Sequence, residues 1–256
     1  MIFDWFRRRR QAEVRARPFP PAWRELIARN VPLAARLDEA GRAALEGLVA
    51  VFLEDKGFEG CGGQVVDDEV RVTIAAQACL FLVGRGPDTD PFPRVRTVLV
   101  YPSAWLGHGK RLQPDGTVIE GGGAHLGEAW SGGPVIVAWD DARSGVRDGK
   151  DGQNVVLHEF AHALDAEDGP VDGAPRLPSR ARYVAWAGVF SDEYRQLVAA
   201  VHADHHTVLD PYGATSPAEF FAVVTETFFE KGEQLKRRHP ALYEQLRTYF
   251  GQDPAG

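Results

Sequence analysis

Two histidines and a glutamate near the middle of the chain have the types and spacing that bind zinc and activate water. His158 and His162 are four residues apart in a His-Glu-x-x-His stretch, so on a helix both imidazoles lie on one face and can bind one ion. Glu159 follows the first histidine, where it can act as general base toward a metal-bound water. The neighbouring residues of 155–164 are otherwise apolar or small, which predicts a helix buried on most sides. The alternative is a helix whose histidines only form hydrogen bonds.

A catalytic zinc usually takes three protein ligands, so this pair needs a third. One known pattern places a histidine six residues after the second one, with a glycine between them. Here Asp168 occupies the histidine position and Asp165 occupies the glycine position, so that pattern is excluded. Asp165 is instead a candidate hydrogen-bond acceptor for the His162 ring, or a residue that ends the helix.

The remaining solution is a glutamate from a later helix. The strongly apolar segment 216–230 contains Glu219 and Glu226, which are seven residues apart and can face the same side. A carboxylate among so many apolar neighbours is costly unless it is paired or coordinated. Ser216 and Glu219 also have the spacing of a helix capping box, so spacing alone leaves Glu219 as either ligand or cap. Glu226 is a candidate partner of a ligand.

The other histidines do not form a convincing site. His202, His205 and His206 occupy a polar helix end without an adjacent glutamate, which predicts a solvated surface cluster. His108 and His125 lie in Gly-rich stretches and have no partner by spacing.

Composition excludes several classes of protein. The net charge of −7 gives no general attraction for nucleic acid. The sequence contains no run of 18 apolar residues, so it predicts no membrane-spanning helix. Cys61 and Cys79 are the only cysteines, which predicts two free thiols in a reducing compartment. No shift in composition divides the 256 residues, so we expect one domain over 21–256, with a helical part over about 21–90.

The first 20 residues are expected to form a flexible basic leader. Four arginines, Arg7 to Arg10, follow the apolar start, which is the wrong order for a signal peptide. A frayed, solvated end is favoured over contact with an anionic membrane surface.

Hydrophobic periodicity predicts an α+β fold that is mostly helical, with a small mixed β-sheet next to the metal-binding helix. Helices are expected at 23–30, 38–56, 67–83, 154–168, 182–201, 216–230 and 241–250. Strands are expected at 96–101 and 134–139, with a possible short strand near 117–120 in an otherwise loop-rich region. We expect 134–139 to be an edge strand to which an extended peptide can add.

Several longer motifs together resemble the Mlc titration factor A family of bacterial zinc metallopeptidases, from about residue 38 to the end. The motifs are Leu-His-Glu-Phe-Ala-His-Ala-Leu-Asp at 157–165, Asp-Pro-Tyr-Gly-Ala-Thr-Ser-Pro-Ala-Glu at 210–219, Val-Leu-Val-Tyr-Pro at 98–102, Gly-Glu-Ala-Trp-x-x-Gly-Pro-Val at 127–135, His-Pro-Ala-Leu-Tyr at 239–243 and Gln-Asp-Pro at 252–254. The first 20 residues match none of the family's motifs known to us.

The resemblance implies a zincin-like fold of the gluzincin type, similar to the catalytic domain of anthrax lethal factor. The family's spacing of seven between a tyrosine and a glutamate matches Tyr212 and Glu219. It therefore implies that Zn²⁺ is held by His158, His162 and Glu219. Glu159 and Tyr212 are then the catalytic residues, and Tyr212 donates to the oxyanion.

The resemblance also implies a cytoplasmic, aminopeptidase-like enzyme that acts on a peptide or protein substrate. The family is linked to the Mlc transcriptional repressor, so an Mlc-like repressor is an implied partner and regulation of sugar uptake an implied role. The alternative is a non-catalytic repressor-binding protein that retains a zinc site. Glu159 argues against this alternative, because a structural zinc normally takes four protein ligands and needs no general base.

Overall fold

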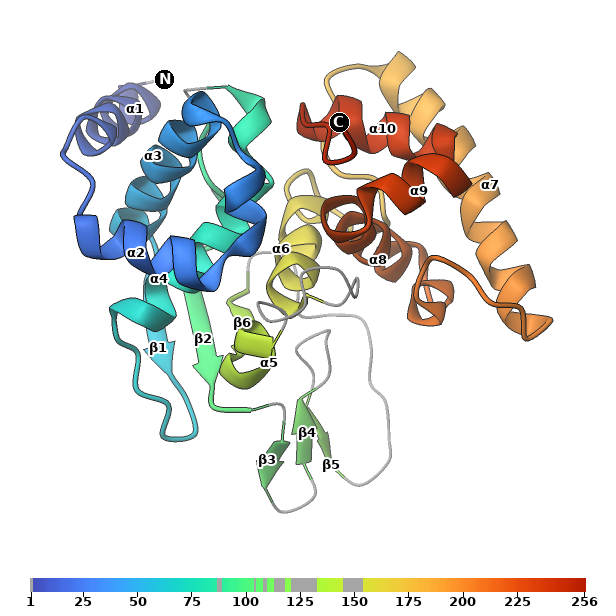
Figure 1. The fold of residues 1–256 in the computed structure, drawn as a ribbon, viewed down its shortest axis with the longest axis horizontal. Coiled ribbons are helices and arrows are strands. Elements are labelled where there is room, and N and C mark those ends of the chain that lie inside the picture. The colour runs from blue at the N-terminus through green and yellow to red at the C-terminus, as the bar shows by residue number, and fades with distance from the viewer. Residues whose placement is uncertain are drawn as a thin grey trace.

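The computed structural model describes residues 2–86, 89–103, 105–107, 110–112, 118–120, 133–144 and 154–256. Helices dominate this part of the chain (Figure 1). They are α1 (Ile2–Arg15), α2 (Pro21–Asn30), α3 (Glu39–Asp55), α4 (Asp68–Leu80), α5 (Trp139–Ser144), α6 (Val155–Asp165), α7 (Arg180–His202), α8 (Pro217–Glu230), α9 (Gly232–Arg238) and α10 (Pro240–Phe250), with short 3₁₀ turns η1 (Pro32–Arg36), η2 (Val83–Arg85) and η3 (Pro211–Ala214).

The strands form two small sheets. The first contains β1 (Gly57–Gly60), β2 (Thr97–Tyr101) and β6 (Val135–Ala138), in the order β1-β2-β6. Both pairings are parallel, with Val98 opposite Val135. The second sheet is antiparallel and contains β3 (Trp105–Gly107), β4 (Lys110–Leu112) and β5 (Val118–Glu120).

The predicted α+β class is confirmed, with one difference in the sheet. We expected a mixed sheet beside the metal-binding helix, whereas the described strands next to α6 are all parallel. Parallel pairing requires a crossover between strands, and α4 lies in the connection from β1 to β2. Among the described strands, β6 is at the sheet edge, as expected.

The helix α6 lies at the centre of the fold, between the two helical groups. Figure 1 shows α1–α4 on one side of it and α7–α10 on the other. It packs against α8, β6 and α4. The core around it is rich in phenylalanine: the ring of Phe160 lies 4.7 Å from that of Phe92 and 5.7 Å from that of Phe52, both in edge-to-face contact. Such contacts between large rings add to the stability that apolar burial provides.

The N-terminal segment differs from the expected flexible leader. Ile2–Arg15 form α1, which packs along α3. Gln11 is 2% exposed and donates to Asp55 and to Asp90, at 3.0 and 2.8 Å. Arg10 contacts Glu54 of α3 at 3.2 Å. The acidic partners of Arg7 and Arg10 are distant in sequence, so a local pattern cannot predict these contacts.

Most other predicted elements are present, and the errors have physical causes. Asp38 and Asp67 cap α3 and α4 by accepting from Gly41 and Val70. The strand β1 was missed because it has few β-forming residues of its own and depends on its pairing with β2. The helices α5 and α9 were missed because they are short and polar.

Two further expectations concern thiols and membranes. Cys61 and Cys79 are free, as predicted. In the described ranges, every helix is too short or too polar to traverse a bilayer.

Candidate metal centre and active site

The helix that carries the His-Glu-x-x-His motif is fixed at its start by a side-chain cap. Asn154 precedes α6, and its Oδ1 accepts a hydrogen bond from the Leu157 amide at 3.0 Å. This satisfies one of the amides that a helix leaves without a partner at its N-terminus. Every residue from Val156 to Asp165 is buried, as the apolar sequence predicted.

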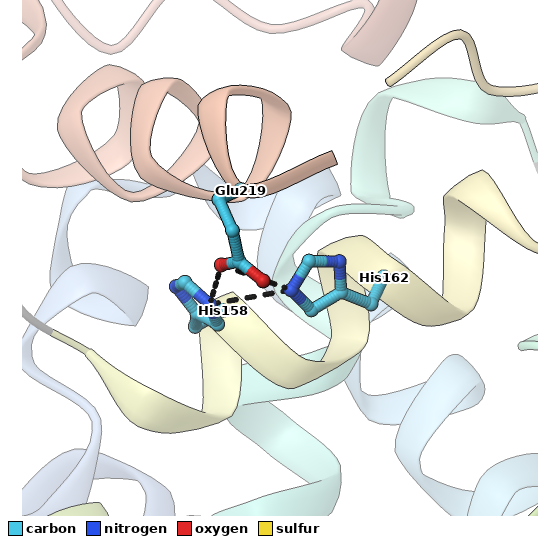
Figure 2. Close-up of side chains that lie close together, drawn as sticks. All are labelled: His158, His162 and Glu219. Atoms are coloured by element: carbon cyan, nitrogen blue, oxygen red, sulfur yellow. Dashed lines mark hydrogen bonds and ion pairs between the residues drawn. The ribbon is translucent and has the colours of Figure 1, made fainter. Parts of the chain in front are cut away.

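His158, His162 and Glu219 come together at the contact between α6 and α8 (Figure 2). His158 Nε2 lies 3.0 Å from Glu219 Oε2 and 3.3 Å from His162 Nε2. His162 Nε2 lies 3.5 Å from the same Glu219 oxygen. Two ligand atoms of a tetrahedral zinc, each 2.0–2.1 Å from the metal, are about 3.3 Å apart. The two nitrogens and one oxygen therefore fit a zinc ion, and all three residues are buried.

Glu219 combines the two interpretations that its spacing left open. Its backbone amide donates to the Ser216 hydroxyl at 3.2 Å, which caps the start of α8. Its carboxylate points toward the two histidines. The amide and the carboxylate of one residue have different partners, so capping does not compete with metal binding.

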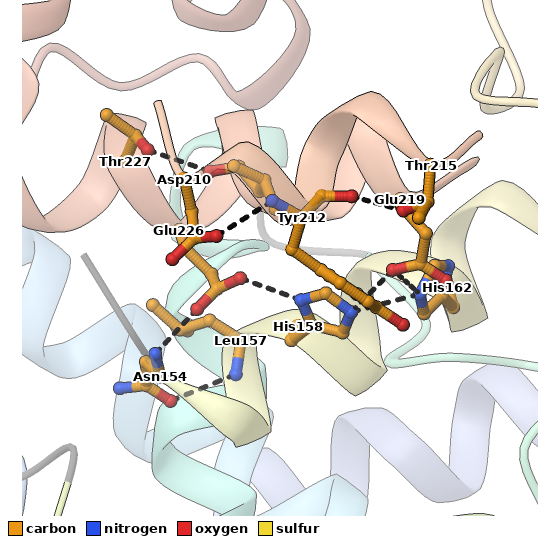
Figure 3. Close-up of polar contacts among 11 residues, drawn as sticks. Asn154, Leu157, His158, His162, Asp210, Tyr212, Thr215, Glu219, Glu226 and Thr227 are labelled. Atoms are coloured by element: carbon orange, nitrogen blue, oxygen red, sulfur yellow. Dashed lines mark hydrogen bonds and ion pairs between the residues drawn. The ribbon is translucent and has the colours of Figure 1, made fainter. Parts of the chain in front are cut away.

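Glu226 holds the far side of the His158 ring (Figure 3). Its Oε1 lies 2.7 Å from His158 Nδ1, and its Oε2 accepts from the Asn154 amide at 2.6 Å. A carboxylate at Nδ1 keeps the proton on that nitrogen and leaves Nε2 as the nitrogen that can bind metal. Glu226 thus orients the ring and also ties α8 to the start of α6.

The protein groups alone give His158 and Glu219 strongly shifted pKa values. Burial lowers the pKa of His158, but the carboxylates of Glu226 and Glu219 outweigh it and keep this pKa well above its usual value. Burial raises the pKa of Glu219, but hydrogen bonds from the two histidines outweigh it and bring this pKa to about 2. A metal ion must therefore displace a proton from His158 when it binds.

Tyr212 extends toward the same group from η3 (Figure 3). Its ring centre lies 6.0 Å from that of His158. The turn that carries it is closed by Asp210, whose Oδ1 accepts from the Tyr212 amide at 2.8 Å, and by Thr215, whose hydroxyl donates to the Tyr212 carbonyl. The side chain is half-buried, as suits a group that meets a substrate.

The two acidic residues on α6 have different surroundings. Glu159 is buried next to the first histidine. Asp165 is 0% exposed and accepts from the Gly173 amide at 2.7 Å through Oδ2. Burial raises the pKa of Asp165 to about 7. The contact with Gly173 shows that Asp165 anchors the segment after α6, a role that the sequence did not suggest.

The rival histidines are not brought into a site. His202, His205 and His206 are exposed at and just after the end of α7. Among the described residues, the one group that could hold a metal ion is His158, His162 and Glu219. His108 and His125 lie outside the described residues. The role of Asn154 in holding Glu226 was missed, although an asparagine before an apolar helical run is a recognised N-cap signal.

Comparisons with known proteins identify the family of the chain. The model of the family described as glucose-regulated metallo-peptidase M90 matches residues 3–251. The chain therefore belongs to the M90 family of metallopeptidases, and the matched region includes α1.

Individual relatives cover nearly the whole chain. An uncharacterized protein of Synechocystis sp. is 43% identical over 253 residues, which are 98% of this chain and 90% of the relative. Proteins called Mlc titration factor A are 30% identical in Serratia proteamaculans and 31% in Yersinia enterocolitica, over 98% of this chain and 93% and 90% of theirs. The resemblance that the motifs suggested is thereby confirmed.

Proposed function

We propose that the protein is a zinc-dependent peptidase that hydrolyses short peptides in the cytoplasm, with an aminopeptidase-like preference. The observation that carries this proposal is the buried group of His158, His162 and Glu219, with ligand atoms 3.0–3.5 Å apart. Two imidazoles and one carboxylate are a common catalytic zinc set, which leaves a fourth position for water or substrate. Membership of a metallopeptidase family supports the same chemistry.

His158, His162 and Glu219 would hold the zinc, and Glu226 would keep the His158 ring in the binding tautomer. Bound zinc lowers the pKa of a coordinated water to about 7 and polarises a carbonyl. Glu159 follows His158 on α6, where its carboxylate can accept the proton of the attacking water and pass it to the leaving amine. Tyr212 would donate its hydroxyl hydrogen to the oxygen that gains negative charge, a contact typically worth about 3 kcal/mol.

The parallel strand β6 would align the substrate. It leads toward α6, packs against it and is at the edge of the described sheet. An extended peptide could add to this edge through backbone hydrogen bonds, which places its scissile bond independently of side-chain sequence.

An Mlc-like repressor as partner, and a role in sugar uptake, are a further part of the proposal. The support is the name Mlc titration factor A carried by relatives at about 30% identity, together with the glucose-regulated description of the family. A non-catalytic protein that binds a repressor and keeps its zinc site is the second candidate. It is favoured by the same names, because titration of a repressor requires binding only.

Glu159→Gln separates the two candidates. The variant should retain about one zinc per chain. Its rate of cleavage of aminoacyl fluorogenic substrates and library peptides should fall at least about 100-fold, because general-base catalysis typically contributes that much. Glu233→Gln is the matched control, because Glu233 is exposed on α9. Peptidase activity unchanged in Glu159→Gln would overturn the catalytic proposal. Repressor binding that survives in this variant would show that the two roles are separable.

A further inference from the structure

A groove of about 600 Å³ lies beyond the C-terminal end of α6. Its walls come from η2, the segment 89–93, the stretch that follows α6, the first turn of α7 and the end of α10. His158, His162 and Glu219 do not line it. Its volume is in the range of small-molecule sites.

Three arginines from three different segments line this groove. They are Arg85 of η2, Arg176 of the stretch after α6, and Arg182 of α7. Within the described ranges none of the three forms an ion pair with a carboxylate, whereas Arg10 and Arg24 do.

Arg85 is the most constrained of the three. Its guanidinium lies over the Tyr249 ring, 4.3 Å from the ring centre. Its Nη2 is buried and has no hydrogen-bond partner in the described part of the chain. Arg85 also lines the groove, so N–H groups of its guanidinium other than the buried Nη2 can donate to an anionic ligand there.

The groove also contains two acidic residues, Asp90 and Glu167, which are fewer than its three arginines. Asp90 is already bound by Arg7 and by Gln11. Burial raises the pKa of Glu167, whereas the charges of Arg85 and Arg176 lower it. Glu167 therefore offsets part of the positive charge, and the three arginines still exceed it in number. The capped N-terminus of the 23-residue helix α7 adds partial positive charge beside Arg182.

We propose that this groove binds a phosphorylated small molecule, with its phosphoryl group between Arg85, Arg176 and Arg182. Guanidinium groups bind phosphate oxygens with two parallel hydrogen bonds. A phosphoryl group offers three oxygens to three arginines, whereas a carboxylate offers two. The volume exceeds that of phosphate alone, and Leu177 and Tyr249 line the wall for the remaining part of the ligand. The site is independent of the proposed peptidase chemistry.

Calorimetric titration of the zinc-loaded protein with phenyl phosphate tests this site. We expect one phenyl phosphate per chain, with an affinity that weakens as salt increases. The Arg176→Gln/Arg182→Gln variant should bind about tenfold more weakly or not at all, because it loses two charge-assisted contacts. Arg237→Gln/Arg238→Gln is the matched control, since these exposed arginines of α9 lie outside the groove.

Three results would overturn the proposal. One is the absence of binding at millimolar phenyl phosphate. Another is equal affinity in the Arg176/Arg182 variant, which would place the anion elsewhere, for example on the zinc. The third is benzoate binding as tightly as phenyl phosphate, which would show that the groove does not select a phosphoryl group. Circular dichroism of both variants checks that each is folded.

Discussion

Glu226→Gln should weaken zinc binding although Glu226 is not expected to touch the metal. The carboxylate uses one oxygen for His158 Nδ1, at 2.7 Å, and the other for the Asn154 amide, at 2.6 Å. Glutamine has almost the same shape but only one acceptor oxygen. One of the two N–H groups must therefore face the new NH₂ group.

Both orientations of the new amide are unfavourable. If its oxygen stays at Asn154, the NH₂ group favours His158 with Nδ1 as acceptor, so the ring proton moves to Nε2 and blocks the metal-binding nitrogen. If its oxygen stays at His158, the buried Asn154 amide loses its acceptor, which costs about 1–3 kcal/mol. Loss of such a supporting contact typically lowers metal affinity about 10- to 100-fold, equivalent to roughly 1.4–2.7 kcal/mol.

Competition with a chromophoric chelator measures this loss directly. The wild type, Glu226→Gln and the control Glu233→Gln are compared at one pH, with circular dichroism to confirm that each is folded. We expect that only Glu226→Gln binds zinc more weakly than the wild type. An unchanged affinity in a folded Glu226→Gln would refute the role given to the contact between Glu226 and His158.

The remaining predictions concern pH and the N-terminal helix. Because neighbouring carboxylates hold the pKa of His158 well above its usual value, protons should compete with zinc more strongly as pH falls. Chelator competition measured between pH 8 and pH 6 should therefore show weaker zinc binding at pH 6. A zinc affinity that does not change over this range would contradict the prediction. Burial raises the pKa of Asp165 from 3.8 to about 7. Between these two pH values the folded chain keeps a proton on Asp165 that the unfolded chain releases. The contribution of Asp165 to the free energy of unfolding should therefore fall by up to roughly 4 kcal/mol as pH rises from about 4 to about 7. Asp165→Asn, which keeps an acceptor for Gly173, should remove that dependence in urea unfolding measured at several pH values, and parallel curves for the two proteins would contradict the assignment. Gln11→Ala should cost about 1–3 kcal/mol of stability through two lost buried hydrogen bonds, and a loss below the error of urea denaturation would support the flexible leader instead.

The parts of the fold that the sequence predicted are those with a strong local signal. α6 and α8 are long apolar runs with a cap residue in front of them, and β2 and β6 are apolar runs rich in valine. By contrast, β1 contains two glycines in four residues and exists through its pairing with β2. α1 is held by Asp90, which is 79 residues from Gln11. Local patterns contain no information about such distant partners.

The sequence also predicted only part of the candidate site. The spacing of His158 and His162 defined half of it. Spacing alone left Glu219 as either third ligand or helix cap, and Glu226 as a candidate partner of a ligand. The difference between them is three-dimensional: Glu219 reaches the Nε2 atoms of both histidines, whereas Glu226 reaches Nδ1 of one. That distinction depends on how α8 crosses α6, which no local pattern encodes.

The most direct test of the central claim is an anomalous difference map from crystals of the zinc-loaded protein, collected on both sides of the zinc absorption edge. We expect one strong peak between α6 and α8, within bonding distance of His158 Nε2, His162 Nε2 and a Glu219 oxygen, and no bond to Glu226. A zinc peak at His202 and His206, or one coordinated by Glu226 in place of Glu219, would contradict it.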